Sequence, residues 1–185
     1  MNAPTRIEGY AIVSDNGMIA TAKGTMPRAL KFDADQEFFE RGLNGVDVVV
    51  HGRHSRERHR RSHMRRRLIL TRRIPSIASD ANNRNALFWN PTGATLEEVL
   101  AVLGAPNDSI GVIGGTDVFG LFLDRYDTFF LTRAPGVQIP GGRAVFPEVP
   151  ALSPEEVLAK HGLTRASSRV LDAKHGLELM TWSRA

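Results

Sequence analysis

The stretch VIGGTDVFG, residues 112–120, joins the end of a short apolar run to a Gly-Gly pair and a segment with helical spacing. The whole run, IGVIGG at 110–115, is typical of a strand covered on both faces. A glycine pair lets the backbone approach a ligand closely, and the free N–H groups of a helix start can bind phosphate. The stretch therefore predicts a strand, a pyrophosphate-binding turn and a helix. It matches neither the Gly-x-Gly-x-x-Gly dinucleotide fingerprint nor a Walker-type Gly-Lys-Ser/Thr, which disfavours Rossmann and kinase folds.

Further apolar runs on both sides of this stretch have the length and composition of buried strands. They lie at 9–14, 46–50, 68–71, 86–89 and 128–132, and LELMTWSR at 177–184 predicts a last strand. Helical segments separate most of them. This alternation predicts an α/β fold with a mostly parallel central sheet covered on both faces. No repeat or low-complexity linker divides residues 1–185, so we expect a single domain.

Capping signals locate three of the helices. A capping box pairs an N-cap side chain with a Glu or Gln three residues later, and a glycine often follows the last turn. Three pairs fit this pattern: Asp33 with Gln36, Thr95 with Glu98, and Ser153 with Glu156. They predict helices that end before Gly45, Gly104 and Gly162 respectively.

The composition excludes several classes of protein. Hydrophobic residues make up 42% and charged residues 24% of the chain, as in a water-soluble globule. No apolar run approaches the roughly 20 residues that span a bilayer. The first residues lack the pattern of a secretory signal. Because the chain has no cysteine, it has neither disulfides nor a thiolate metal site, and we expect a cytoplasmic protein.

Positive charge is concentrated in HGRHSRERHRRSHMRRR, residues 51–67. This run holds eight arginines and one glutamate, a net charge of +7, so the rest of the chain carries −3 of the overall +4. The run has little to bury as a helix, and most of it is expected to be an exposed loop. A nucleic-acid-binding module is one interpretation, but the run lacks the interleaved aromatic residues that stack on bases, so this partner is disfavoured.

Two further phosphate-binding signals follow predicted strands. HGRHS at 51–55 offers a glycine and donor side chains, and LTRR at 70–73 places two arginines beyond the next strand. A guanidinium binds phosphate in bidentate geometry. Open α/β sheets bind ligands at the carboxyl ends of their strands, so these two signals and the glycine pair predict one phosphate site.

Asp35 is the carboxylate that we single out as a catalytic candidate. It shares a face of the helix expected at 33–43 with Phe39, four residues on. An acid in a first helical turn is also explained simply by the helix dipole. If Asp35 is buried, its pKa is raised, which suits it to bind a protonated or amidine-like heterocycle and to assist proton delivery.

From about residue 8 to about residue 183 the chain resembles the dihydrofolate reductase superfamily. The resemblance rests on the order and spacing of several motifs, none of them decisive alone. These are AIVSDNGMIA (11–20), the MP pair (26–27), DADQEFFER (33–41), VVVHGRHS (48–55), RRRLILTR (65–72), VIGGTDVF (112–119), FFLTR (129–133) and VFPEV (145–149). The implied fold has about eight mostly parallel strands flanked by about four helices.

The resemblance implies an NADPH-dependent reductase and a role for each matching residue. Asp35 is the implied active-site acid, and Thr132 supports it. The implied substrate-binding residues are Ile12, Asp35, Phe39, Arg65, Ile113 and Thr132, where Arg66 or Arg67 could take the place of Arg65. The implied NADPH-binding residues are Ile12, Ile19, Gly52, Arg53, His54, Ser55, Thr71, Arg72, Gly114, Gly115, Thr116 and Val118, with Arg53 and Arg72 near the 2′-phosphate.

Two substrates are consistent with this resemblance. The implied reaction is the reduction of 7,8-dihydrofolate, a pterin, to tetrahydrofolate. However, Ala20 and Arg28 depart from the usual folate pattern, and the segment before Asp35 is about two residues longer. GMIAT at 17–21 is similar to the riboflavin-biosynthesis reductase, which reduces a ribosyl-aminopyrimidine phosphate, and Arg28 could favour such a phosphorylated substrate. The Gly-Arg-His-Ser motif at 52–55, Phe39 and the pair of Asp35 and Thr132 favour the folate enzymes. A catalytically silent relative is a further alternative.

The four histidines of the arginine-rich run are a poor metal site. His51, His54, His59 and His63 lie among eight cations, whose field opposes a bound metal ion. We therefore expect no bound metal. Because no apolar run is long enough to span a bilayer, we also expect no membrane partner. The sequence leaves open whether the protein is a monomer or a homodimer.

Overall fold

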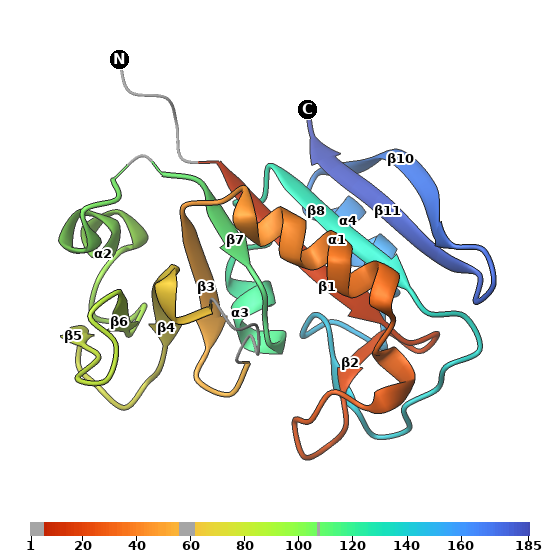
Figure 1. Ribbon diagram of the computed structural model, residues 1–185, viewed down its shortest axis with the longest axis horizontal. Coiled ribbons are helices and arrows are strands. Elements are labelled where there is room, and N and C mark those ends of the chain that lie inside the picture. The colour runs from red at the N-terminus through yellow and green to blue at the C-terminus, as the bar shows by residue number, and fades with distance from the viewer. Residues whose placement is uncertain (1–5, 56–61, 107) are drawn as a thin grey trace.

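The computed structural model describes residues 6–55, 62–106 and 108–185, and it contains a nine-stranded sheet (Figure 1). The strand order is β10-β11-β8-β1-β7-β3-β4-β6-β5. Their bounds are β1 Ile7–Val13, β3 Val48–Gly52, β4 Arg66–Leu70, β5 Ile77–Ser79, β6 Ala86–Trp89, β7 Ile110–Val112, β8 Thr128–Arg133, β10 Leu163–Asp172 and β11 Leu177–Arg184. A small second sheet pairs β2 (Met18–Ala20) with β9 (Arg143–Ala144).

The pairing confirms the predicted α/β class with a mostly parallel sheet. β1 lies in the middle of the sheet, parallel to β7 on one side and to β8 on the other. The β3, β4, β6 and β7 pairings are also parallel, whereas β5, β10 and β11 pair antiparallel at the two edges. The predicted runs each contribute to one of these strands. The sheet has nine strands instead of about eight.

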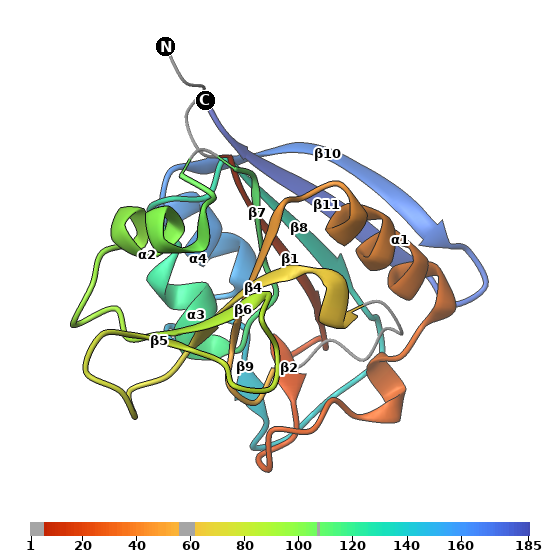
Figure 2. The same ribbon diagram turned by 60° about the vertical axis from the view of Figure 1, so that its left-hand side comes forward.

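The helices lie on both faces of the sheet. Helix α1 (Asp33–Asn44) covers one face, and α2 (Leu96–Leu103), α3 (Thr116–Leu121) and α4 (Pro154–Lys160) cover the other (Figure 2). Under α1 is a small buried cluster of Tyr10, Leu43 and Val49. The larger core lies between the sheet and the other three helices. In the part of the chain that the structure describes, no helix has the length and apolarity needed to cross a bilayer.

Two of the three predicted capping boxes are confirmed. Thr95 begins α2 and Ser153 begins α4, each in a reciprocal pair with the Glu three residues later. The third prediction is wrong, because Phe32 is the N-cap of α1 and makes no side-chain capping bond. Asp33 is instead the first helical residue, where its charge interacts favourably with the helix dipole.

Candidate active site

Two adjoining pockets lie at the carboxyl ends of the parallel strands. The first, which we call the basic cleft, has a volume of about 870 Å³. The second, the acid pocket, has a volume of about 600 Å³. They share one stretch of wall, formed by Ile19, Ala20, Gly24, His54, Ser55, Gly115 and Arg143. A ligand that fills both therefore passes this shared wall.

The basic cleft is built from successive strand ends, as the sequence predicted. Gly52 ends β3, Thr71 follows β4, and Gly115 follows β7. The backbone N–H of Gly52 donates to the carbonyl oxygen of Gly114 at 2.7 Å, which fixes the two turns side by side. The ends of parallel strands meet at one edge of a sheet, and they bring residues distant in the sequence into one site.

The glycine pair is required by its surroundings. Gly114 has a φ of +100°, and a Cβ there would lie 2.6 Å from the ring of Phe119. A Cβ on Gly115 would lie 3.2 Å from the Ser55 hydroxyl. It would take up space beside the wall that the two pockets share. The peptide bond between Gly114 and Gly115 is cis. A side chain at either position would be strained or would fill space that a ligand could occupy.

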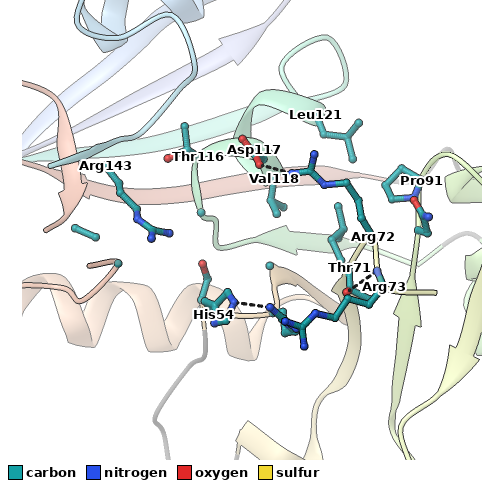
Figure 3. Close-up of a pocket in the computed structure, with 18 of the residues that line it drawn as sticks. His54, Thr71, Arg72, Arg73, Pro91, Thr116, Asp117, Val118, Leu121 and Arg143 are labelled. Carbon is teal, nitrogen blue, oxygen red and sulfur yellow. Dashed lines mark hydrogen bonds and ion pairs between the residues drawn. The ribbon is translucent and has the colours of Figure 1, made fainter. Parts of the chain in front are cut away.

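Positive charge dominates the basic cleft. Among the described residues, its lining includes four arginines, Arg53, Arg72, Arg73 and Arg143, and a single carboxylate, Asp117. Arg53 Nη2 and His54 Nε2 lie 2.9 Å apart. Arg143 reaches into the cleft from β9, and His54 lies on the opposite side (Figure 3). Such a concentration of guanidinium groups fits a ligand that carries phosphate.

Asp35 supplies the acid of the second pocket. It is half-buried on α1, and burial raises the pKa of its carboxyl from 3.8 to about 6. The Thr132 side chain on β8 forms a hydrogen bond with Asp35 that partly opposes this rise in pKa. Among the described residues that line the pocket, Asp35 is the only carboxylate. With a pKa of about 6, Asp35 is mostly ionised at pH 7, but it keeps a larger protonated fraction than an aspartate of ordinary pKa, and this fraction can deliver a proton.

Aromatic rings surround this acid. Phe38 and Phe39 on α1 line the pocket together with Tyr10 and Phe130 from the sheet. The Tyr10 and Phe130 rings stack with centroids 5.0 Å apart, and Phe39 meets Tyr10 edge-on at 6.3 Å. The Tyr10 hydroxyl donates to Glu8, and burial raises the pKa of this tyrosine. The apolar wall suits a flat heterocycle and desolvates the Asp35 carboxyl.

Most of the residues predicted for the site line one pocket or the other. Ile12, Asp35, Phe39, Ile113 and Thr132 line the acid pocket. The basic cleft is lined by Ile19, Gly52, Arg53, His54, Ser55, Thr71, Arg72, Gly115, Thr116 and Val118. Ile12, which was also predicted to bind the cofactor, lines only the acid pocket, and Gly114, the residue before Gly115, is in the lining of neither pocket. The Thr116 hydroxyl donates to the carbonyl oxygen of Ala144 at 2.5 Å, so in this arrangement it could only accept a hydrogen bond from a ligand.

The arginines at 65–67 lie outside the lining of both pockets. Arg65 donates to the carbonyl oxygen of Leu43 at 2.7 Å, near the end of α1. Arg66 contacts Asp108 at 2.6 Å and the carbonyl oxygen of Gly104, the C-cap of α2, at 3.2 Å. Arg67 is buried and donates to the carbonyl oxygen of Ser62. Substrate binding by one of them remains a prediction, and the expected loop at 56–61 lies outside the described residues.

Several lining residues were not predicted from the sequence. Asn90, Pro91 and Thr92 follow β6 and line the basic cleft. The strand-end rule that located the other turns would have located this one too. Lys23, Lys31 and Arg143 line the acid pocket from loops and from β9. They follow no predicted strand and carry no local signal. Arg28, considered for a phosphorylated substrate, lines neither pocket.

The architecture is that of the dihydrofolate reductases, which confirms the fold predicted from the motifs. One similar structure is dihydrofolate reductase from Enterococcus faecalis complexed with NADP(H) and RAB-propyl. It matches at a TM-score of 0.67 and 18% identity, and the match covers 100% of this chain and 99% of that one. A protein of riboflavin biosynthesis from Shewanella sp. PV-4 matches at a TM-score of 0.66 and 19% identity, with 98% and 99% covered.

A third similar structure is a diaminohydroxyphosphoribosylaminopyrimidine deaminase/5-amino-6-(5-phosphoribosylamino)uracil reductase from Thermotoga maritima. It matches at a TM-score of 0.66 and 17% identity, and the match covers 98% of this chain but 57% of that one. No family model and no curated protein matches the sequence. At these identities the likeness establishes the fold, and the function has to be argued from the site.

Proposed function

We propose that this protein is an NADPH-dependent reductase that converts 7,8-dihydrofolate to tetrahydrofolate. The observation that carries the proposal is the position of Asp35. This acid, with a pKa of about 6, lies in an aromatic pocket that shares a wall with an arginine-rich cleft. The reduction of a C=N bond requires a hydride donor on one side of the substrate and a proton source near the nitrogen.

The residues of the basic cleft fit a phosphorylated nicotinamide. The arginines and His54 offer donors for its phosphates, and the backbone at Gly52 and Gly115 leaves room for close approach. When it is bound, this cofactor supplies the hydride. Arg53 and Arg72 would hold its 2′-phosphate, and Ile19, Ser55 and Gly115, which line both pockets, would contact the cofactor where the pockets adjoin.

Asp35 holds the proton that completes the reaction. Phe38 and Phe39 line the pocket beside it, burial raises the pKa of its carboxyl, and the hydrogen bond with Thr132 would orient it. In its ionised form Asp35 would bind the amino group and ring nitrogen of a pterin as a bidentate acceptor. In its protonated form it would promote protonation of the nitrogen next to the carbon that accepts hydride. Thr132 stabilises the ionised form and so keeps the pKa of Asp35 from rising further.

A second candidate substrate is the ribosyl-aminopyrimidine phosphate of riboflavin biosynthesis. The observation that favours it is the presence of Lys23, Lys31 and Arg143 in the lining of the acid pocket. These three cations fit a substrate that carries a phosphate of its own. Arg65, which the folate interpretation assigns to the substrate carboxylate, instead contacts the Leu43 carbonyl oxygen.

A side-by-side assay of NADPH oxidation distinguishes the two substrates. Purified protein is mixed with NADPH and either dihydrofolate or the aminopyrimidine phosphate, and the loss of the reduced-nicotinamide absorbance is followed. We expect turnover with dihydrofolate and little with the alternative. Turnover with the aminopyrimidine phosphate alone would replace the proposed substrate, and turnover with neither would contradict the proposed function.

A further inference from the structure

Asp117 is a carboxylate in an otherwise cationic wall. It lies on α3, and it is the only acid among the described residues that line the basic cleft. Its Oδ2 accepts a hydrogen bond from Arg72 Nη2 at 3.1 Å. Figure 3 shows the Arg72 side chain reaching toward Asp117 from the far side of the cleft. The Arg72 side chain remains 84% exposed and the Asp117 side chain 80% exposed.

This ion pair does little to stabilise the fold. Exposed pairs contribute little because water screens them and two long side chains have to be held in place. The pair instead affects what Arg72 can bind. An anion that contacts Arg72 through the same nitrogen has to displace the Asp117 carboxylate or lie next to it, where two negative charges repel.

The carboxylate is also suited to a different ligand group. In the dinucleotide sites of Rossmann folds an acidic side chain accepts a hydrogen bond from an unmodified ribose 2′-hydroxyl, whereas an arginine accommodates a 2′-phosphate, and the same chemistry applies to any site that presents both groups. The basic cleft has both groups within 3.1 Å of each other. Arg73 lies next to Arg72 in the same lining and supplies a second cation.

We propose that Asp117 is a specificity-determining residue that makes the basic cleft accept NADH as well as NADPH. The proposal rests on the proposed use of a nicotinamide cofactor. With NADH bound, Asp117 keeps its ion pair with Arg72 and also accepts a hydrogen bond from the ribose 2′-hydroxyl. With NADPH bound, Arg72 turns from Asp117 to the 2′-phosphate, and the nearby carboxylate limits the gain in affinity.

The test compares the affinities of NADPH and NADH by isothermal titration calorimetry, which needs no turnover. We expect the wild-type protein to bind both cofactors, with a preference for NADPH of about tenfold or less. Asp117→Asn removes the charge but keeps the shape of the side chain. It should raise the ratio of NADPH to NADH affinity by about threefold or more, since NADPH binds more tightly and NADH more weakly.

Glu97→Gln is the matched control. Glu97 forms a similar exposed ion pair with Arg125, with 2.9 Å between Oε1 and Nη1, and neither residue lines a pocket. This variant should leave the ratio unchanged. An unchanged ratio in Asp117→Asn, or wild-type binding of NADPH without measurable NADH binding, would overturn the role of Asp117 alone. Binding of neither cofactor would overturn this role and the proposed function together.

Discussion

The basic cleft and the acid pocket share a wall but use charge in opposite ways. The arginines of the basic cleft are many and mostly exposed, so water screens each of them. In the part of the chain that the structure describes, the acid pocket has a single carboxylate, Asp35, which is half-buried, and burial raises its pKa. Under the proposed function, the exposed charges of the basic cleft serve affinity for the cofactor, whereas the half-buried carboxyl of the acid pocket serves reactivity. Substitutions in the basic cleft should therefore lower mainly the affinity for the cofactor, and substitutions in the acid pocket should lower mainly the turnover rate.

The largest expected effect is that of Asp35→Asn. The amide keeps the shape of the side chain but cannot deliver a proton, so turnover should fall by about 10²- to 10⁴-fold. The affinity for NADPH, measured by calorimetry, should stay within about twofold, because Asp35 does not line the basic cleft. A variant that retains turnover within about tenfold of the wild type would remove the distinction between the pockets.

The stability of the same variant is its own control for folding. The folded-state pKa of Asp35, about 6, lies above its ordinary value of 3.8. At neutral pH the ionised carboxylate is therefore less stable in the folded protein than in the unfolded chain, and it lowers the free energy of unfolding. Replacing it with an amide should leave the free energy of unfolding at pH 7 unchanged or raise it. Urea unfolding measures this directly, and a large loss of stability would mean that the lost turnover reflects misfolding.

The next effect in size is that of Arg53→Ala on the basic cleft. Loss of a charge-assisted contact to phosphate should weaken NADPH binding by about tenfold to a hundredfold, and the remaining affinity should depend less on salt. Turnover at saturating NADPH should fall much less than in Asp35→Asn. Arg66→Ala is the matched control from the same arginine-rich run, because Arg66 contacts Asp108 and Gly104 outside both pockets.

Arg66→Ala should lower the free energy of unfolding by about 1 kcal/mol and leave NADPH affinity unchanged. Equal loss of NADPH affinity in the two arginine variants would mean that the run acts through its overall charge. That outcome would contradict the assignment of Arg53 to cofactor binding and of Arg66 to contacts that stabilise the fold.

A smaller change is expected from Thr132→Val, which sharpens the account of the acid pocket. In the wild type the rate should fall as pH rises through about 6, because Asp35 loses its proton. Removal of the Thr132 hydroxyl takes away a bond that lowers the pKa of Asp35, so the midpoint of the pH–rate curve should move to higher pH. Above the original midpoint the rate should rise by up to about tenfold. A midpoint that moves to lower pH would contradict the assignment.

The smallest effect concerns a charged cluster away from both pockets. His161 Nδ1 lies 2.6 Å from Asp124, and its Nε2 lies 3.2 Å from Glu148. These carboxylates, Asp124 first, raise the pKa of His161, while Lys160 and, to a smaller extent, His161 lower the pKa of Glu148. The raised histidine pKa contributes stability below its unfolded value of about 6.5, and this contribution is lost as pH rises through the folded value.

His161→Gln should therefore flatten the dependence of the melting temperature on pH on the alkaline side of about 6.5. On the acid side, the contribution of Glu148 is lost as pH falls through its lowered pKa. The variant should keep the pH–rate curve of the wild type, since His161 lines neither pocket. A changed pH–rate curve would mean that the titration near pH 6 does not belong to Asp35.

The sequence predicted the parts of the site that rest on local patterns. Helical spacing placed Asp35 and Phe39 on one face, and both line the acid pocket. The rule that ligands bind at strand ends located Gly52 and Gly115 in one cleft. These predictions succeed because the periodicity of a helix and the common direction of parallel strands are fixed by the backbone.

Other features depend on contacts between distant segments. Arg143 comes close to Gly24 through the β2–β9 sheet, whose strands are too short to show an alternating pattern. The carbonyl oxygens that Arg65 and Arg66 contact belong to the ends of α1 and α2, far away in the sequence. Strand β10 was missed because almost all of it is exposed, so it shows no buried face.

The most direct test of the central claim is an NMR titration of the Asp35 carboxyl in the ligand-free protein. Protein labelled with ¹³C at aspartate carboxyls is titrated with acid, and Asp35→Asn identifies the signal. We predict a midpoint near 6, well above the ordinary aspartate value of 3.8. A midpoint near 3.8, the ordinary value, would show that the carboxyl is solvated and would contradict its role as the proton source.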